Sequence, residues 1–238
     1  MAKAFDAEFQ SESLNSDIFL NKILKKDCYI TNDPKTVKIF KHFKNSFIFL
    51  KTKKKIKKKI NKLKFIGTSV TFKKRIQFIE RHIRKKNINY KSNLNSEQKK
   101  KVINIAFRNF KNSRFHLDKR IPTSKSNIIK KKTLENFFLG LRSDKILVQF
   151  YKNNISGFCL LKYADKTKVI IDLICIDSKF TRMGLARDLI LFSLNKLKKM
   201  KKKILIVSTQ KENLASMKLY NKLKFIPKEK SLLYHYIS

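Results

Sequence analysis

One stretch of the chain, residues 168–220, constrains the fold more than any other, because apolar runs alternate there with amphipathic segments. Residues 169–176 are apolar and mostly β-branched, which predicts a buried strand. Apolar residues at helical spacing then predict a helix over about 185–200. A second apolar run, residues 204–207, predicts another buried strand, and a short helix follows from Asn213. Strand, helix, strand and helix in this order predict an α/β fold in which the two strands are parallel.

The loop that joins the first of these strands to the first helix, FTRMGLA, carries small residues where a backbone must approach another group closely. The N-terminus of a helix presents free N–H groups and a partial positive charge, which together favour a phosphate or pyrophosphate. The loop lacks the three glycines of a dinucleotide-binding fingerprint, and no Gly-Lys-Ser/Thr follows as in a Walker loop. We therefore predict an anion-binding loop that consists of Thr181, Arg182, Met183, Gly184, Leu185 and Ala186.

The second helix carries the spacing N-x-x-S-x-x-x-Y, which Asn213, Ser216 and Tyr220 occupy. Residues seven apart lie on one face of a helix, so the side chains of Asn213 and Tyr220 can reach the same ligand. Each residue also has an ordinary structural interpretation. Asn213 would then cap the helix, and Tyr220 would be an amphipathic residue of the core.

Together, the loop and the second helix resemble the acetyl-CoA-binding region of the GNAT N-acetyltransferases. The loop of that family reads R/Q-x-x-G-x-G/A, and Gly184 and Ala186 match its last two fixed positions. The first position falls on Thr181, which departs from the pattern. The resemblance implies that the loop binds acetyl-CoA, that Asn213 binds its pantetheine arm, and that Tyr220 protonates the departing thiolate.

The middle of the chain, residues 96–167, extends the pattern in the N-terminal direction. A helix is predicted from Ser96 to about residue 110, and a second one over 124–141. Strands are predicted over 146–151 and 155–163, and the turn Lys-Asn-Asn joins them as a hairpin. Two helices, a hairpin and then the strand and helix alternation described above form the order of elements in the GNAT fold.

The chain is long enough for one large domain or two small ones. Residues 81–95 are polar and turn-rich, which predicts a join between two domains. We predict a smaller α/β domain over 1–95 and, over 96–238, a GNAT domain whose mixed central sheet is flanked by helices. The hexapeptide NKLKFI occurs at 61–66 and again at 221–226, where each copy is predicted to end a helix and begin a strand. This repeat favours an interpretation of the N-terminal domain as a degenerate half of the same fold, without acetyl-CoA.

Within the N-terminal domain, the predicted elements alternate between strand and helix, as in other α/β proteins. Pro34 suits the start of a helix, because its φ angle is fixed near the helical value and its missing N–H is not needed there. The predicted elements are an extended segment over 18–30, a helix over 35–44, a strand over 47–50, a helix over 53–63 and a strand over 65–72.

The chain carries 58 Lys and Arg residues against 17 Asp and Glu, and its formal net charge of +41 would suit a nucleic-acid-binding protein. Only nine of these cations are Arg, whose planar fork is the usual means of specific phosphate and base recognition. We interpret the lysine runs at 51–59 and 198–203 as solvated helix faces and expect no specific nucleic-acid binding. The basic field should still attract anionic ligands such as CoA and nucleotide sugars.

The sequence predicts no metal site, because its four His residues are scattered and its three Cys residues lack metal-ligand spacing. Cys28, Cys159 and Cys175 lie in apolar surroundings, which predicts reduced thiols in a cytoplasmic protein. No apolar run approaches the roughly 20 residues of a membrane span. The acidic, polar N-terminal segment is unlike a signal peptide, so we expect no membrane partner.

Within the GNAT family, the segments SRFHLD, FLGLRSDKILVQF and STQKENLASMKLYNKLKF resemble the TDP-fucosamine acetyltransferase subgroup, which acetylates nucleotide-linked amino sugars for surface polysaccharides. This resemblance implies an acetyl-CoA donor, direct transfer in a ternary complex, and no metal. The dense polar cluster around residues 113–122 supplies Arg114, His116 and Asp118 as candidate substrate residues, and Gln210 is a further candidate. The sequence leaves a homodimer open.

In the mechanism that this resemblance implies, the acceptor amine loses a proton and attacks the thioester carbonyl. Asp172, a carboxylate within an apolar strand, is a candidate base or amine-orienting group, and the alternative is a buried structural residue. His116 is a second candidate base. We expect the strand to splay before the loop, so that backbone groups of Ile174, Cys175 and Ile176 bind the pantetheine amides and polarise the carbonyl.

Two other functions fit the same residues. One is a GNAT enzyme that acetylates a protein, such as the N-terminus or a lysine of a ribosomal protein. The other is a non-enzymatic, basic RNA-binding protein, which predicts salt-dependent RNA affinity without acetyl-CoA binding.

Overall fold

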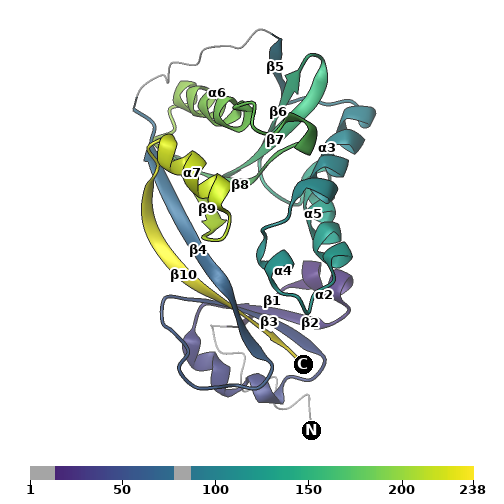
Figure 1. Cartoon of the computed structure of the whole chain (residues 1–238), viewed down its shortest axis with the longest axis vertical. Helices are drawn as coiled ribbons and strands as arrows, with labels where there is room; N and C mark the ends of the chain where they lie inside the picture. Colours follow the sequence, from purple (N-terminus) through teal and green to yellow (C-terminus); the bar gives the residue numbers. More distant parts are fainter. Residues whose placement is uncertain (1–13, 78–86) are drawn as a thin grey trace.

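The computed structural model describes residues 14–77 and 87–238, and every strand within them belongs to one continuous sheet (Figure 1). The strands are β1 (Leu14–Ser16), β2 (Asp27–Thr31), β3 (Ser46–Thr52), β4 (Leu63–Arg75), β5 (Ile88–Lys91), β6 (Lys145–Tyr151), β7 (Asn154–Tyr163), β8 (Lys168–Ile176), β9 (Ile204–Gln210) and β10 (Ile226–Ile237). The helices are α2 (Ile18–Leu24), α3 (Ser96–Asn109), α4 (Arg114–Leu117), α5 (Thr123–Phe138), α6 (Leu185–Lys199) and α7 (Leu214–Lys222). Short 3₁₀ turns are η1 (Pro34–Lys38), η2 (Phe40–His42) and η3 (Ser178–Phe180).

The order of strands across the sheet is β1-β2-β3-β10-β4-β9-β8-β7-β6-β5. The pairs β2–β3 and β8–β9 are parallel, and the other neighbouring pairs are antiparallel. The sheet is therefore mixed, and the parallel pairing predicted for the strands that begin near residues 169 and 204 is confirmed.

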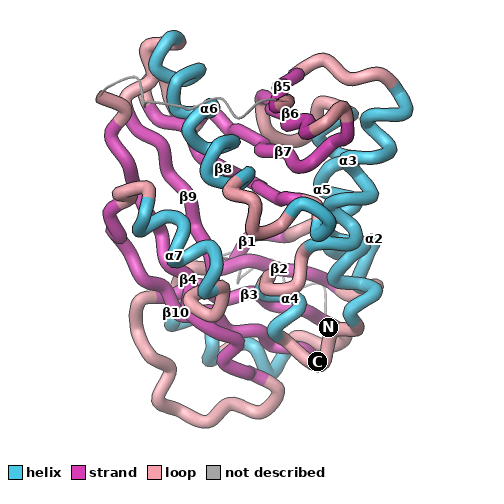
Figure 2. Tube along the Cα trace, turned by 45° about the horizontal axis from the view of Figure 1, so that its top comes forward, coloured by secondary structure: helices cyan, strands magenta, loops and turns pink. Residues whose placement is uncertain are grey.

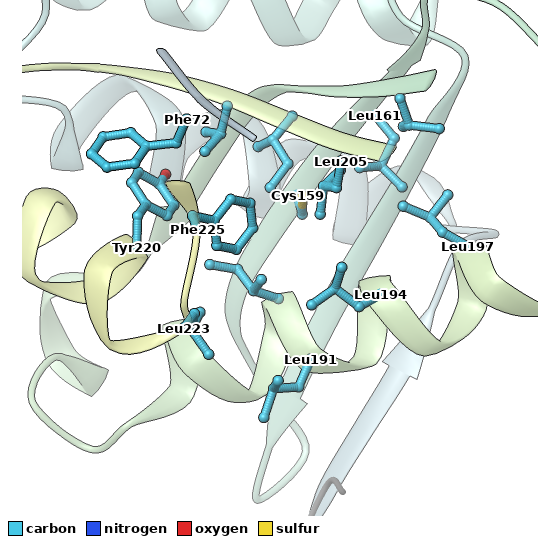
Figure 3. Close-up of a cluster of buried hydrophobic side chains, with 14 of the residues drawn as sticks. Phe72, Cys159, Leu161, Leu191, Leu194, Leu197, Leu205, Tyr220, Leu223 and Phe225 are labelled. Atoms are coloured by element: carbon cyan, nitrogen blue, oxygen red, sulfur yellow. The ribbon is translucent and has the colours of Figure 1, made fainter. Parts of the chain in front are cut away.

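Helices cover both faces of this sheet (Figures 1 and 2). On one face, α6 and α7 pack on β4, β7, β8 and β9, and Figure 3 shows part of the apolar core that they form, with Leu194, Leu205 and Phe225 among its residues. On the other face, α3 and α5 pack on β6, β7 and β8 around residues such as Leu134 and Phe158. The central strands are thus buried on both sides, which is why their sequences read as nearly continuous apolar runs.

Strand β4 joins residues 14–77 to residues 87–238, because it lies between β9 and β10 in the sheet. It pairs with β9 from Ser69 to Arg75 and with β10 along most of its length. The strands of residues 14–77 thus form no sheet of their own. The division into two domains at residue 95 stays a prediction.

Two predicted elements of the N-terminal part are wrong. The segment over 18–30 is not extended throughout, because it contains α2, whose first turn is capped by the Asp17 carboxylate, 3.1 Å from the Leu20 nitrogen. The helix predicted over 53–63 is a loop. Lysines at 53–55 and 57–59 flank Ile56, so like charges would repel one another at helical spacing. The helix predicted over 35–44 consists of η1 and η2.

The hairpin and helix predictions of the middle region are confirmed. Lys152 and Asn153, at the turn between β6 and β7, both have positive φ angles, as a tight two-residue hairpin turn requires. α3 begins at Ser96 as predicted, although its cap is Asn95, which forms a capping box with Gln98. Residues 81–86 of the predicted join lie outside the described residues, and the remainder of the join contains β5.

The first copy of NKLKFI contains the start of β4, and the second copy ends at the first residue of β10. These two strands are antiparallel neighbours. Lys62, at the second position of the first copy, and Lys224, at the fourth position of the second copy, both adopt a left-handed conformation, with φ angles of 66° and 56°. The second copy ends α7 and leads into a strand, as predicted. The first copy leads into a strand but follows the lysine loop instead of a helix.

A buried polar cluster fastens the segment after α4 to β10. Asp118, which is 2% exposed, accepts hydrogen bonds from Arg120 Nε (2.9 Å) and Nη2 (2.8 Å), and it lies 2.9 Å from Nδ1 of His235. Arg120 also donates to the carbonyl oxygens of Lys62 and His235. Although burial would raise the pKa of Asp118, hydrogen bonds from His235 and Arg120 hold it below its usual range. This cluster joins the segment after α4 to β10 and to Lys62, the residue before β4.

No helix in the described part of the chain is long and apolar enough to cross a membrane. Cys28, Cys159 and Cys175 are all buried and free. Burial raises the pKa of each thiol to about 12, so all three stay protonated at neutral pH.

The buried His235 should make stability depend on pH. Burial lowers its pKa from 6.5 to about 4 despite the hydrogen bond with Asp118, so the unfolded chain binds a proton first as the pH falls. We expect the free energy of unfolding to decrease by about 2–3 kcal/mol between pH 6.5 and pH 4 through this group. Urea unfolding at several pH values measures this loss, and His235→Phe should remove it. An equal decrease in the variant would contradict the assignment.

Candidate active site

The two parallel strands β8 and β9 separate into a fork at their C-terminal ends. They pair from Lys168–Ile204 to Ile171–Val207, but β8 continues to Ile176 and β9 to Gln210 without pairing with each other. Each strand stays paired on its outer side, β8 with β7 and β9 with β4. Backbone N–H and C=O groups on the inner edges of the fork are therefore free to bind an extended ligand. The expected splay is confirmed.

A β-bulge at Asp172 marks the start of the fork. Leu161 pairs with Ile171 and Leu160 with Leu173, so Asp172 is an extra residue on β8. Side chains two apart normally share a face, yet Ile171 belongs to the core under α6 and Leu173 to the core under α3 and α5. The bulge thus exchanges the faces to which alternate side chains of β8 point, and it bends the strand away from β9.

The loop after β8 is exposed and ends at the N-terminus of α6. Arg182 and Gly184 have positive φ angles, 63° and 76°, and Gly184 is the N-cap residue of α6. No described side chain caps this helix, so the N–H groups of its first turn are available to an anion. Arg182 and Arg187 are exposed, and both are close in sequence to the N–H groups of this first turn. Of the predicted residues, Thr181 to Met183 precede this helix end, Gly184 caps it, and Leu185 and Ala186 begin α6.

Gln149 fixes the start of α6 and was not among the predicted residues. It is fully buried on β6, and its Nε2 donates to the carbonyl oxygen of Leu185 at 3.1 Å. Its Oε1 accepts a hydrogen bond from the Ser156 hydroxyl at 3.1 Å. The signal available in the sequence is a lone Gln within the apolar run ILVQFY.

Gly157 lets β7 approach the open end of β8. A Cβ atom at this position would lie 2.6 Å from the carbonyl oxygen of Cys175 and would also clash with the side chain of Ile176. A larger residue would therefore displace the arm of the fork that contains Ile174, Cys175 and Ile176. Sequence analysis did not single out this glycine.

Asn213 and Tyr220 have the structural roles that were left open as alternatives. Asn213 is the N-cap of α7, and its Oδ1 accepts a hydrogen bond from the Ser216 nitrogen at 3.3 Å. Tyr220 is 2% exposed, and its ring lies between Phe72 and Phe225 (Figure 3). Burial, and secondarily Cys159, raises the pKa of Tyr220 above its usual value, so the phenol keeps its proton at neutral pH. A catalytic role for either residue stays a prediction.

Asp172 is held by an ion pair, which disfavours the role of general base. Its carboxylate accepts two hydrogen bonds from Arg142, each of 2.8 Å, and one of 2.6 Å from the Ser143 hydroxyl. Burial alone would raise the pKa of Asp172, but the hydrogen bonds and charge of Arg142 outweigh it and lower the pKa. The carboxylate is a weaker base than an ordinary aspartate and is better suited to orienting a neighbouring group.

The predicted substrate residues of the α4 region differ in their surroundings. Asp118 belongs to the buried cluster with His235 and presents almost no surface to a substrate. His116 is partly buried, and its Nδ1 and Nε2 lie within hydrogen-bond distance of Ser113 Oγ (2.6 Å) and Asn127 Oδ1 (2.9 Å). Both ring nitrogens are thus engaged, which disfavours a base. Arg114 is partly buried and is a better candidate, as is Gln210, which is partly buried at the end of β9.

Among residues 14–77 and 87–238, no group of three or more His, Cys, Asp or Glu side chains could hold a metal ion. The chemistry that the fork offers comes from backbone groups and a helix N-terminus. An acyl thioester with a phosphate-bearing tail fits such a set of groups, because an extended amide chain and an anion would each find partners.

Residues 111–225 match the model of the acetyltransferase (GNAT) family. These residues are similar to the GNAT acetyltransferases. They make up just under half of the chain and include α5, the fork, the Gly184 loop and Tyr220. The match supports an acetyl-CoA-dependent N-acetyltransferase. No curated protein matches the sequence.

Solved structures agree with this match in their fold. A conserved protein of unknown function from Staphylococcus epidermidis is similar over 96% of this chain and 92% of its own, with a TM-score of 0.67 and 11% identity. A GCN5-related N-acetyltransferase from Sphaerobacter thermophilus has a TM-score of 0.56 at 8% identity, over 93% of this chain and 75% of its own. A GCN5-related N-acetyltransferase from Kribbella flavida has a TM-score of 0.54 at 8% identity, over 88% of this chain and 80% of its own. The predicted GNAT fold, a mixed sheet flanked by helices, is thereby confirmed.

We predict that Gln149→Leu lowers stability, because it removes the hydrogen bonds that hold the start of α6. An unsatisfied buried polar group costs about 1–3 kcal/mol, which corresponds to a fall of about 2–10 °C in the melting temperature of a chain of this size. Thermal unfolding measures the change. Asn154→Ala, which alters an exposed side chain on the same hairpin, is the control and should change the melting temperature little. Equal melting temperatures for wild type and Gln149→Leu would contradict the proposed role of the amide.

Proposed function

We propose that the protein transfers the acetyl group of acetyl-CoA to a primary amine, and that the acceptor is a nucleotide-linked amino sugar used for surface polysaccharide. The observation that carries the transfer is the fork between β8 and β9, which opens directly beside the uncapped N-terminus of α6. The acceptor class rests on the resemblance of the segments around residues 113–118 and 208–225 to that subgroup.

In this proposal, the pantetheine arm lies in the fork as an extra, short strand. The inner edge of β8 from Asp172 to Ile176 supplies N–H and C=O groups for its two amides. One of these N–H groups, at Ile174 or Ile176, also polarises the thioester carbonyl, because developing negative charge on that oxygen is stabilised by a fixed donor. Asn213 contacts the same arm from the start of α7.

The pyrophosphate of acetyl-CoA binds the loop from Thr181 to Ala186. Its charge interacts favourably with the N–H groups at the start of α6 and with the positive end of the helix dipole. Gly184 permits the close approach, since a side chain there would occupy the space of a phosphate oxygen and would be strained at a φ angle of 76°.

The chemical step is a direct attack of the acceptor nitrogen on the thioester carbon. The new C–N bond forms as the C–S bond breaks, and the nitrogen loses a proton to a water molecule. The phenol of Tyr220 gives its proton to the CoA thiolate. Asp172 orients the acceptor through Arg142 and Ser143 and takes no proton, because its pKa is lowered. We propose that the reaction takes place in the cytoplasm, where the donor is made and used.

We predict that Gly184→Val abolishes acetyl-CoA binding, because the side chain fills the phosphate position. Isothermal titration calorimetry measures the affinity, which should fall by at least a factor of about 100. Gly140→Val is the matched control: Gly140 has a φ angle of 75°, and a Cβ there would meet nothing within 4 Å. The control thus carries the same backbone strain without crowding the loop. Unchanged affinity in a folded Gly184→Val variant would contradict the assignment of the loop.

We predict that Tyr220→Phe lowers kcat by on the order of 10²–10⁴-fold, because the ring stays in place while the proton is lost. Acetyl-CoA affinity and melting temperature should change little, since the ring still packs on Phe72 and Phe225. Steady-state turnover and a thermal melt on one preparation test both points. Near-wild-type kcat would remove Tyr220 from the catalytic residues and leave it as part of the core.

A further inference from the structure

The side chains of Arg114, Lys130 and Arg142 are near enough to repel one another, and Arg142 contacts Asp172 at the start of the fork. Arg142 follows α5 and is paired with Asp172, the bulged residue at which β8 and β9 separate. Arg114 is on α4 and Lys130 on α5, and both are partly buried. The proposed acetyl transfer uses Asp172 and Arg142 but assigns no role to Lys130.

Arg114 is packed for contact with a flat or charged group. Its guanidinium carbon lies 3.9 Å from the ring centre of Phe49 and 4.4 Å from that of Phe115. Its Nε is buried and has no hydrogen-bond partner among the described residues. An orphaned, buried donor on a charged side chain is costly, so such a group commonly marks the position of a bound polar atom.

Lys130 is held in the same charged environment. Its Nζ lies 5.1 Å from the ring centre of Phe110. Burial, and then the neighbouring charges of Arg114 and Arg142, lowers the pKa of Lys130 to about 8, although Asp172 and Cys175 oppose the shift. A bound anion would reverse this effect, because it would replace lost hydration and offset the repulsion between the cations.

The acidic side chains near these cations do not balance them. Asp172 accepts three hydrogen bonds from Arg142 and Ser143 and is thereby occupied. Asp17, the N-cap residue of α2, attracts the charge of Arg114. Its carboxylate also accepts a hydrogen bond from the Leu20 N–H. Neither Arg114 nor Lys130 forms an ion pair with a residue that the structure describes. Three cations, Arg114, Lys130 and Arg142, thus face two carboxylates, Asp172 and Asp17. One positive charge remains in excess at a partly buried position.

We propose that Arg114 and Lys130, with Arg142 beside them, form an anion subsite that holds a carboxylate or a phosphate group of the amine acceptor. The subsite determines specificity, since it would favour amines that carry a negative group over neutral amines of the same shape. Its place at the start of the fork sets the amine next to the thioester. This inference rests on the proposed function, because it takes the fork to be the site of acetyl transfer.

Paired acceptors that differ in one charge test the proposal on the full chain. Glycine against glycinamide tests the carboxylate, and glucosamine 6-phosphate against glucosamine tests the phosphate. We expect the charged member of at least one pair to have a KM lower by a factor of about ten or more, because hydrogen bonds to charged groups are the strong ones. The pair with the larger ratio identifies the source of the anion.

Lys130→Met should raise the KM for the charged acceptor about tenfold while leaving that for the neutral acceptor and the melting temperature unchanged. Arg114→Met should act in the same direction and is the second variant. Lys132→Met is the matched control, because it removes the same charge from the same helix at an exposed residue paired with Glu135. Equal KM values within both pairs, or an equal effect of Lys130→Met and Lys132→Met, would overturn the subsite.

A binding measurement separates failure of the subsite from failure of the proposed function. Calorimetric titration with inorganic phosphate and with acetate needs no acetyl transfer. If no amine is acetylated but one anion binds to wild type and to Lys132→Met and not to Lys130→Met, the subsite stands and the proposed transfer fails. If all three proteins bind both anions equally, or bind neither, the subsite is overturned whatever the turnover.

Discussion

The position of β4 between β9 and β10 is the constraint on which the rest of the structure depends. β9 can diverge from β8 at Val207 only because its other edge is hydrogen-bonded to β4 as far as Gln210. β8 is held in the same way by β7. The fork is thus a gap between two rigid halves of one sheet, each stabilised from its outer side, and its unpaired backbone costs less than a frayed strand end would.

Much of the fork could be predicted from local sequence. The apolar runs near residues 169 and 204, and the helical spacing after Gly184, specify strand, loop and helix through residues close together in the chain. The match of the family to residues 111–225 covers the same region. The position of β4 could not be predicted in this way, because the pairing of Arg75 with Ile204 joins residues far apart in sequence. Periodicity within a strand specifies its faces and leaves its neighbours open.

The same distinction explains why the partners of individual residues could not be predicted. A lone Asp within an apolar strand indicated function, and Asp172 does lie at the fork, but its partners Arg142 and Ser143 come from a distant loop that no spacing in the sequence indicates. Asp118 looked similar in a dense polar cluster, yet it is bound by Arg120 and by His235, 117 residues away. The lysine run before β4 was interpreted as a helix face, although repulsion between its charges keeps it as a loop.

The order of synthesis gives β4 a further importance. The ribosome makes this strand well before β9 and β10, which come from residues 204–210 and 226–237. Both edges of β4 must wait for partners that do not yet exist, so an unpaired strand is exposed for most of translation. Contacts that close such long loops form slowly and leave time for wrong pairing. The lysines of the adjoining loop carry like charges beside this strand, and like charges near a strand edge disfavour its pairing with another chain.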